Sequence, residues 1–307
     1  MRRFFRIAPL YYLAGLFYIL VVVFNNYVSF QSKWYPIIHL SPIKLIANFT
    51  FLNGIYLPAI DYLPPGGWSV GDEMLFYLAI PLLFSKITSL KKAFLILTGS
   101  IIVSFIVQTL LYFFIIKYTH YSWVTVRGWQ FYFWLPNQFP VFCFGILLFF
   151  IISSDKIKYK EWMICLSIVL IVLLSFYNYQ LTFPKVLIQR EYLYSAAFCF
   201  FAFSLSKTKL RFLVSPVNKF GKVSFSMYLI HFVVIDVIWQ AFKLIFHDGV
   251  NSDINFIIVY GLTIFITYLI SQITYRYIER KGISKGETYI EKIKQKTQLK
   301  ENDISLS

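Results

Sequence analysis

The sequence has 307 residues, of which 58% are hydrophobic and only 14% are charged. So few polar residues cannot cover the surface of a soluble globule, and we therefore expect an integral membrane protein that crosses the bilayer several times. The formal net charge of +15 would suggest nucleic-acid binding in a soluble protein. Here the basic residues lie in short segments between apolar runs and in the tail, where they indicate membrane topology, so no nucleic-acid partner is expected.

Eight apolar runs are candidates to cross a bilayer as helices, which takes about 17 to 25 residues each, and the run at 192–206 is shorter than this. They are residues 7–24, 70–87, 93–116, 135–153, 162–179, 192–206, 223–246 and 254–278. A further segment, 37–57, is interrupted by Pro42, Lys44 and two asparagines, and we expect it to be re-entrant or interfacial. The predicted fold class is all-α, a polytopic integral membrane helical bundle of about eight transmembrane helices.

The distribution of Lys and Arg sets the orientation of these runs. If both ends of the chain are cytoplasmic and 37–57 does not cross, the cytoplasmic segments receive all but seven of the 29 basic residues. The seven that remain for the outside or the spans are Lys33, Lys44, Lys117, Arg127, Lys185, Arg190 and Lys243. Cytoplasmic loops of membrane proteins are enriched in basic residues. The sequence therefore predicts eight spans, cytoplasmic termini and an outward-facing turn at residues 64–69.

That turn opens the most informative stretch of the chain, PPGGWSVGDEMLFY at residues 64–77. A Pro/Gly turn leads into an apolar helix that carries two adjacent carboxylates near its start, and such groups in membrane helices are hydrated, paired or functional. A helix beginning near Ser69 places Ser69 and Glu73 on one face, with Asp72 about 100° away from Glu73. The alternative is that Ser69 caps the helix and both acids complement its dipole. We interpret Ser69 and Glu73 as candidate catalytic residues, because a cap does not need a carboxylate one full turn inside the helix.

His231 is the second candidate, since it is the only histidine within a clear transmembrane run. Imidazole is suited to proton transfer near neutral pH. Ser224 and Tyr228 share a helix face with His231, so a polar stripe is expected there. The alternative is that these groups form hydrogen bonds with neighbouring helices. The histidines and cysteines show no metal-ligand spacing, and no phosphate-binding or dinucleotide motif occurs, so no metal site is predicted.

These stretches resemble the membrane acyltransferase 3 family, whose members O-acylate sugars of bacterial surface and secreted polysaccharides. Arg3 and Arg6 are similar to the arginines of the family's RxxR motif, and Ser69 and Glu73 to its SxxxE motif. Residues 224–231, followed by 275–279, resemble the last two spans of the family. The resemblance covers nearly the whole chain, and the middle motif with its PGGWS lead-in is the most specific part.

The resemblance implies a multi-pass protein of the inner (plasma) membrane without a bound cofactor. It takes acyl-CoA, such as acetyl-CoA, from the cytoplasm as donor and acylates a polysaccharide or lipid-linked glycan acceptor. Arg3 and Arg6 would bind the phosphates of the donor, or serve only as positive-inside anchors. Glu73 would orient an acceptor hydroxyl or a catalytic imidazole, and Ser69 would donate to the acyl carbonyl.

The aromatic residues of the outer segment fit a membrane-interface belt first and a sugar-stacking platform second. The tryptophans in question are Trp123, Trp129 and Trp134.

In the family, two further spans precede the RxxR motif, the first with a histidine regarded as catalytic and the second with a Phe-Phe-x-x-Ser-Gly motif. We therefore expect an N-terminally incomplete member, with an acyltransferase domain at 1–281, a charged cytoplasmic tail at 282–307 and little or no activity. The alternatives are a non-catalytic remnant or helper, and a polysaccharide flippase or polymerase. Short outer loops disfavour a polymerase, and eight spans are too few for a flippase.

Overall fold

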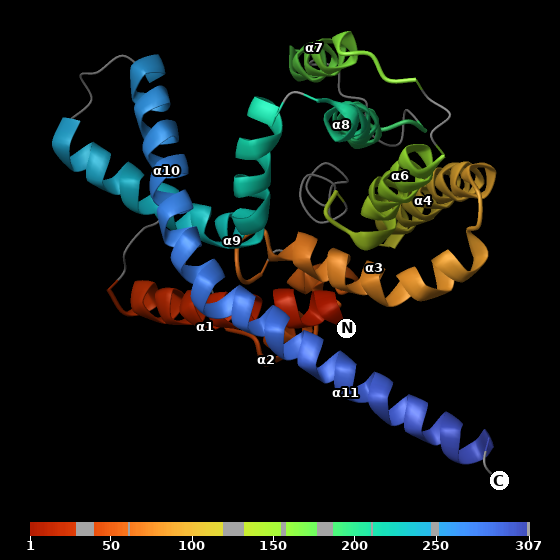
Figure 1. Cartoon of the computed structure of the whole chain (residues 1–307). Helices are drawn as coiled ribbons and strands as arrows, with labels where there is room; N and C mark the ends of the chain where they lie inside the picture. Colours follow the sequence, from red (N-terminus) through yellow and green to blue (C-terminus); the bar gives the residue numbers. More distant parts are fainter. Residues whose placement is uncertain are drawn as a thin grey trace. The chain divides into compact units, whose positions relative to one another are not determined.

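The computed structural model describes residues 1–28, 40–60, 62–118, 132–154, 158–176, 187–209, 211–246 and 252–305 (Figure 1). Its long helices are α1 (Arg2–Val28), α3 (Gly67–Lys86), α4 (Leu90–Tyr118), α6 (Leu135–Ser153), α7 (Trp162–Phe176), α8 (Arg190–Lys207), α9 (Arg211–Phe246), α10 (Ser252–Thr274) and α11 (Arg280–Ser305). A short helix, α2 (Pro42–Phe49), and a π-helix, η4 (Tyr275–Glu279), complete the α-type elements. The described residues contain no strand, which confirms the all-α prediction.

Each of the eight predicted runs lies on a helix. Five helical segments are long and apolar enough to cross a membrane by length and composition: Arg2–Phe24, Leu90–Phe114, Leu135–Ser153, Val214–Phe242 and Ile254–Gln298. The other three runs correspond to α3, α8 and the shorter apolar helix α7. A polytopic helical membrane bundle is therefore confirmed. The largest difference in a described boundary is at α9, which begins at Arg211, whereas the apolar run begins at residue 223. The lysines before the span are good helix formers.

The interrupted segment forms no single spanning helix in its described part. Residues 37–39 lie outside the described residues. The eight residues of α2 extend only about 12 Å at 1.5 Å per residue. Two 3-10 turns follow, η1 (Leu52–Gly54) and η2 (Leu57–Ala59). A chain that turns this often cannot cross about 30 Å of hydrocarbon, in agreement with a re-entrant or interfacial segment.

The chain forms two compact units, which we describe separately. The first comprises Met1–Phe49, Asp61–Gly67 and Pro216–Ser307. Within it, α10, η4 and α11 follow one another as a continuous rod, and α1 packs along η4 and α11 (Figure 1). A Cβ on Gly282 would overlap the carbonyl oxygen of Phe5, and one on Gly286 would lie 2.8 Å from the Phe5 Cβ. The glycines therefore permit close approach of α11 to α1, and the predicted boundary at residue 281 falls inside α11.

The second unit comprises Thr50–Ile60 and Trp68–Ser215. In it α4 packs against α6, α6 against α8, and α8 against α7 (Figure 1). Phe76 of α3 anchors this helix to α6, since its ring stacks on Phe142 with centroids 4.6 Å apart and meets Phe139 edge-on at 5.6 Å. These ring contacts hold α3 to the rest of the second unit.

A buried hydrogen-bond network joins α4, α6 and α8. Gln108 Nε2 donates to Asn137 Oδ1 at 2.7 Å, and Ser104 Oγ lies 3.2 Å from the Tyr192 hydroxyl. Asn137 Nδ2 in turn donates to Glu191 Oε1 at 3.1 Å. Inside an apolar bundle such bonds fix which helix faces meet, because an unpaired amide there is costly.

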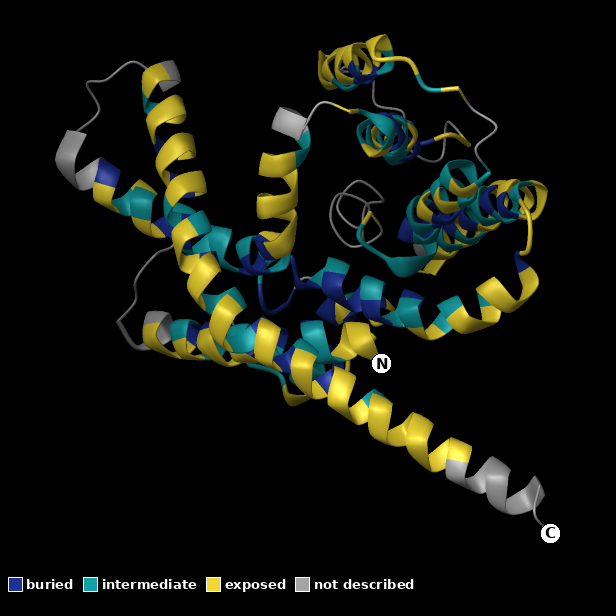
Figure 2. Cartoon of the chain, viewed as in Figure 1, coloured by how far each residue is buried: buried dark blue, intermediate teal, exposed yellow. Residues whose placement is uncertain are grey.

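Large apolar side chains cover the outer faces of several helices. Figure 2 shows long exposed stretches on α7 and α10. On α10 they include Ile254, Phe256, Ile257, Tyr260 and Phe265. Contiguous apolar surface of this kind is typical of a helix that contacts lipid.

Candidate functional site

The turn before α3 has the hallmarks of a type II β-turn. Gly67 N–H donates to Pro64 O at 2.8 Å, Pro65 takes the second position, and Gly66 takes the third with φ of +73°. Proline and glycine are the residues that these two positions favour, because the third position needs a positive φ. The turn ends directly at Gly67, the first residue of α3.

Within the first unit, α9 holds this turn. The Tyr228 hydroxyl donates to the Gly66 carbonyl oxygen at 2.7 Å. A Cβ on Gly66 would lie 2.7 Å from that hydroxyl and 3.0 Å from the Phe232 ring. Glycine at this position therefore permits both the positive φ and the close approach of Tyr228. Ser69 lies three residues further along the chain.

Ser69, Glu73 and Tyr77 are spaced i, i+4 and i+8 on α3, so they lie along one face. All three side chains are half-buried, and the Tyr77 hydroxyl donates a short hydrogen bond to the Glu73 carboxylate. The predicted convergence of Ser69 and Glu73 on one face is confirmed. The sequence analysis missed Tyr77 as the partner of Glu73, although the i+4 spacing could have indicated it.

Asp72 has different surroundings from its neighbour Glu73. It is completely buried, and neither carboxylate oxygen has a hydrogen-bond partner among the described residues. Its side chain lies against Gly54 of η1, where an added Cβ would overlap Oδ1 of Asp72, and Asn53 lies against Gly71 in the same manner. This reciprocal packing holds η1 against the start of α3. Asp72 is thus buried between η1 and the start of α3, whereas the Glu73 side chain is only half-buried and remains partly exposed on the surface of α3.

His231 lies on α9 in the first unit, half-buried, with its ring 4.0 Å from that of Phe232. Its Nδ1 is 2.7 Å from the backbone oxygen of Tyr228 and 3.3 Å from that of Met227. Carbonyl oxygens only accept hydrogen bonds, so Nδ1 carries a proton, and in the neutral ring Nε2 has the lone pair. The Ser224 hydroxyl donates to Gly221 O at 3.0 Å, a bond within α9.

Arg6 is engaged by a carboxylate that the sequence analysis did not single out as its partner. Arg6 Nε lies 3.4 Å from Glu279 Oε2, with side-chain exposures of 27% and 0% respectively. The hydroxyl of Ser226, also completely buried, donates a short hydrogen bond to the other oxygen of Glu279. Arg3 is exposed in the first turn of α1. The two arginines of the RxxR pattern therefore have unequal roles, since Arg6 compensates a buried charge.

Aromatic side chains in the second unit gather near the start of α6. Trp68 stacks on Phe133 with centroids 4.3 Å apart, and Trp134 Nε1 donates to Ile55 O at 3.0 Å. The other two tryptophans proposed for the outer segment, Trp123 and Trp129, lie outside the described residues. Trp134 thus has a structural contact of its own.

The predicted site residues fall into two groups. Ser69 and Glu73 belong to the second unit, and Arg3, Arg6 and His231 belong to the first. No group of three or more His, Cys, Asp or Glu side chains within the described ranges is arranged to hold a metal ion.

A comparison with protein families matches residues 1–276 to the acyltransferase domain of the acyltransferase 3 family. No curated protein and no solved structure matches the chain. The match covers α1 through α10 and the first two residues of the π-helix η4, and so includes the RxxR and SxxxE regions. The chain belongs to the acyltransferase 3 family and is a membrane acyltransferase.

Proposed function

We propose that this acyltransferase transfers an acetyl or other acyl group from acyl-CoA to a sugar hydroxyl of a polysaccharide or lipid-linked glycan. One observation carries the proposal: Ser69 and Glu73 share a half-buried face of α3 directly after a glycine turn, with the Glu73 carboxylate fixed by Tyr77. A neutral alcohol and a thioester need a proton acceptor, a donor to the carbonyl oxygen and a site shielded from water. This face of α3 offers the first two groups.

In the proposed reaction the acceptor oxygen attacks the thioester carbonyl carbon and loses its proton to a base. The carbonyl oxygen gains negative charge, which the Ser69 hydroxyl stabilises by donating a hydrogen bond. The C–S bond then breaks, and the proton passes to the leaving thiolate, so that CoA-SH and the sugar ester are released. Glu73 binds and orients the acceptor hydroxyl.

Two groups are candidates for the base, one in each unit. Glu73 is one, and Nε2 of His231 is the other, because its lone pair is left available by the bonds at Nδ1. Transfer that survives His231→Ala would leave Glu73 as the base of these two.

Arg3 is proposed to contact the phosphates of the acyl-CoA donor, since guanidinium groups bind phosphate oxygens bidentately. Its exposure at the first turn of α1 supports this role. For Arg6, a phosphate of the donor would compete with the Glu279 carboxylate for the same guanidinium group.

The experiment uses membranes that contain the chain, labelled acetyl-CoA and the surface polysaccharide of the host. Because the family match indicates acyltransferase activity, label should appear in the polysaccharide as an ester that mild alkali removes, contrary to the sequence-based expectation of little or no activity. Membranes with the Glu73→Gln variant provide the matched control, and equal labelling in both would overturn the assignment of this face of α3. The family match favours this chemistry over a flippase or polymerase, which would consume no acyl donor.

A further inference from the structure

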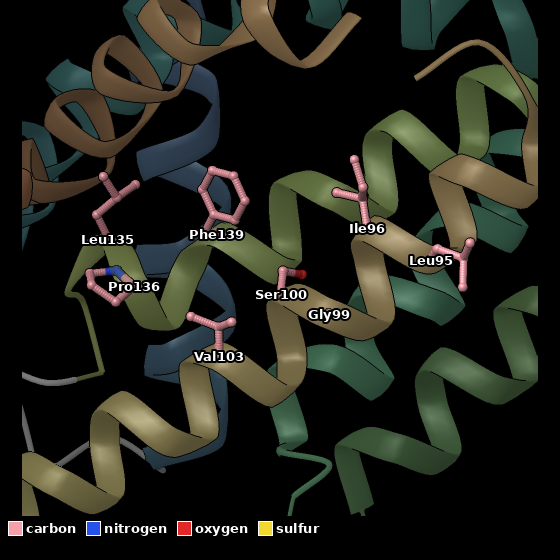
Figure 3. A pocket seen from close by; sticks show the side chains of 8 residues that line it. All are labelled: Leu95, Ile96, Gly99, Ser100, Val103, Leu135, Pro136 and Phe139. Carbon is pink, nitrogen blue, oxygen red and sulfur yellow. The ribbon is translucent and has the colours of Figure 1, made fainter. Parts of the chain in front are cut away.

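A pocket of about 510 Å³ lies between α4 and α6 (Figure 3). Residues 95–103 of α4 form one wall, and residues 135–139 of α6 form the other. The volume falls within the range of small-molecule sites, roughly 300–1,000 Å³. All lining residues belong to the second unit.

The side chains that line the pocket are almost entirely apolar. Its one side-chain hydroxyl, on Ser100, already donates to Leu97 O at 2.7 Å. Polar residues next to the lining residues in the chain have partners within the protein; they are Thr98, Ser104, Asn137 and Gln138. No lining side chain has a buried polar atom without a partner. The pocket therefore offers nothing to a sugar or a water molecule, and it suits hydrocarbon.

The pocket is also continuous with lipid-facing surface. Both α4 and α6 are among the helices that can cross a membrane. The rim residues Leu95 and Val103 are 59% and 58% exposed, and α4 carries further exposed apolar residues at Ile102, Ile106 and Leu110. Residues 95–103 extend for about 12 Å along the helix axis at 1.5 Å per residue, well within a hydrocarbon core of about 30 Å.

We propose that this pocket binds one hydrocarbon chain of a bilayer phospholipid. The chain enters sideways from the bilayer between α4 and α6. The driving force is packing: walls that face a void lose their dispersion contacts, and a hydrocarbon chain restores them. The bilayer interior is as apolar as the pocket, so the hydrophobic effect does not favour transfer of the acyl chain into it. The fit between the shape of the pocket and the acyl chain therefore determines how strongly the chain is bound.

Gly99 makes the proposal testable with a matched control. It lies in the α4 wall, and an added Cβ would meet no atom within 4 Å, so Gly99→Leu would extend into the pocket without a backbone clash. Gly145 of α6 likewise has open space around a Cβ but does not line the pocket. Gly145→Leu therefore adds the same side chain to the same helix pair without filling the pocket.

The test reconstitutes the full chain in vesicles of phosphatidylethanolamine and phosphatidylglycerol that contain a phospholipid with a diazirine in its acyl chain. After irradiation and digestion, mass spectrometry should find label concentrated in residues 95–103 and 135–139. Gly99→Leu should lower this label at least about threefold, the equivalent of some five lost carbon–carbon contacts. Gly145→Leu should leave it unchanged.

Two outcomes would overturn the proposal. One is labelling in the wild type that is no higher at the pocket than at Phe113 and Phe114, the exposed residues near the other end of α4, which would indicate ordinary boundary lipid. The other is unchanged labelling in a folded Gly99→Leu protein. If that variant does not fold, the wild-type labelling pattern alone decides.

Discussion

At the scale of single residues, the two neighbouring carboxylates of α3 have opposite surroundings. Glu73 is half-buried and bonded to Tyr77, whereas Asp72 is completely buried against Gly54. Glu73→Gln should lower acyl transfer by about 10²- to 10⁴-fold, the contribution of a positioned acid or base, and should leave the protein in the membrane. Transfer of labelled acetyl groups to the host glycan measures this effect. Full activity of the variant would make Glu73 a structural residue.

For Asp72 we predict the reverse pattern. Asp72→Asn keeps the shape of the side chain and removes a carboxyl group that has no hydrogen-bond partner among the described residues. The amide places an uncharged polar group of the same shape in the same buried space, so the variant should be at least as thermostable as the wild type in detergent and should retain transfer activity. A loss of activity at unchanged thermal stability would show that the carboxyl group takes part in the reaction.

Substitution of Arg3 and of Arg6 should have different effects on stability and on donor binding. Arg6→Ala leaves the buried Glu279 without its cation and should destabilise the protein by about 2 kcal/mol, the lower range for breaking such pairs because Arg6 is partly exposed. Adding Glu279→Gln should restore part of this stability. Arg3→Ala should instead raise the KM for acyl-CoA. Thermal unfolding and initial rates measure the two effects, and an unchanged KM in Arg3→Ala would contradict the assignment.

At the scale of elements, a double-mutant cycle can measure the contact between Tyr228 of α9 and Gly66 in the turn before α3. Tyr228→Phe removes the bond to Gly66 O and should cost about 1 kcal/mol. Gly66→Ala places a Cβ at positive φ, 2.7 Å from the same hydroxyl, and should cost about 1–2 kcal/mol from the backbone alone. Because Tyr228→Phe removes the shortest of the contacts that the new Cβ would make, the double variant should be less destabilised than the sum of the two.

Gly261 of α10 supplies the control for this cycle. An added Cβ there meets no atom within 4 Å, so Gly261→Ala should be neutral or stabilise the helix by up to about 1 kcal/mol. Thermal unfolding of the four variants in one detergent gives the coupling energy. Strict additivity of the Gly66 and Tyr228 substitutions would show that the two residues do not interact.

At the scale of the whole molecule, the distribution of basic residues predicts that both termini are cytoplasmic. Reporter fusions after Lys92 and Lys160 should therefore report the cytoplasm. A third fusion belongs at Lys209 rather than at Lys222, because Lys222 lies about three turns inside α9, whereas Lys92 lies in the first turn of α4. A periplasmic signal at two of these three positions would refute the predicted topology.

The sequence by itself determined the membrane class, the positions of the helices and the shared face of Ser69 and Glu73. These features depend on composition and on local periodicity, which act over a few residues. For the same reason α6 was found with its bounds unchanged, at 135–153. Run length was less informative for the beginning of α9, because this helix continues through polar residues, such as Lys219 and Lys222, that end the apolar run.

Only the tertiary structure decided which polar groups meet. Glu279 pairs with Arg6 across 273 residues of sequence, and Tyr228 reaches Gly66 across 162. The burial of Asp72 against Gly54 likewise depends on how η1 folds back on α3. Such contacts follow from the packing of helices that are distant in the chain, and no local pattern encodes them, because a buried carboxylate can be satisfied by any donor that the packing brings within reach.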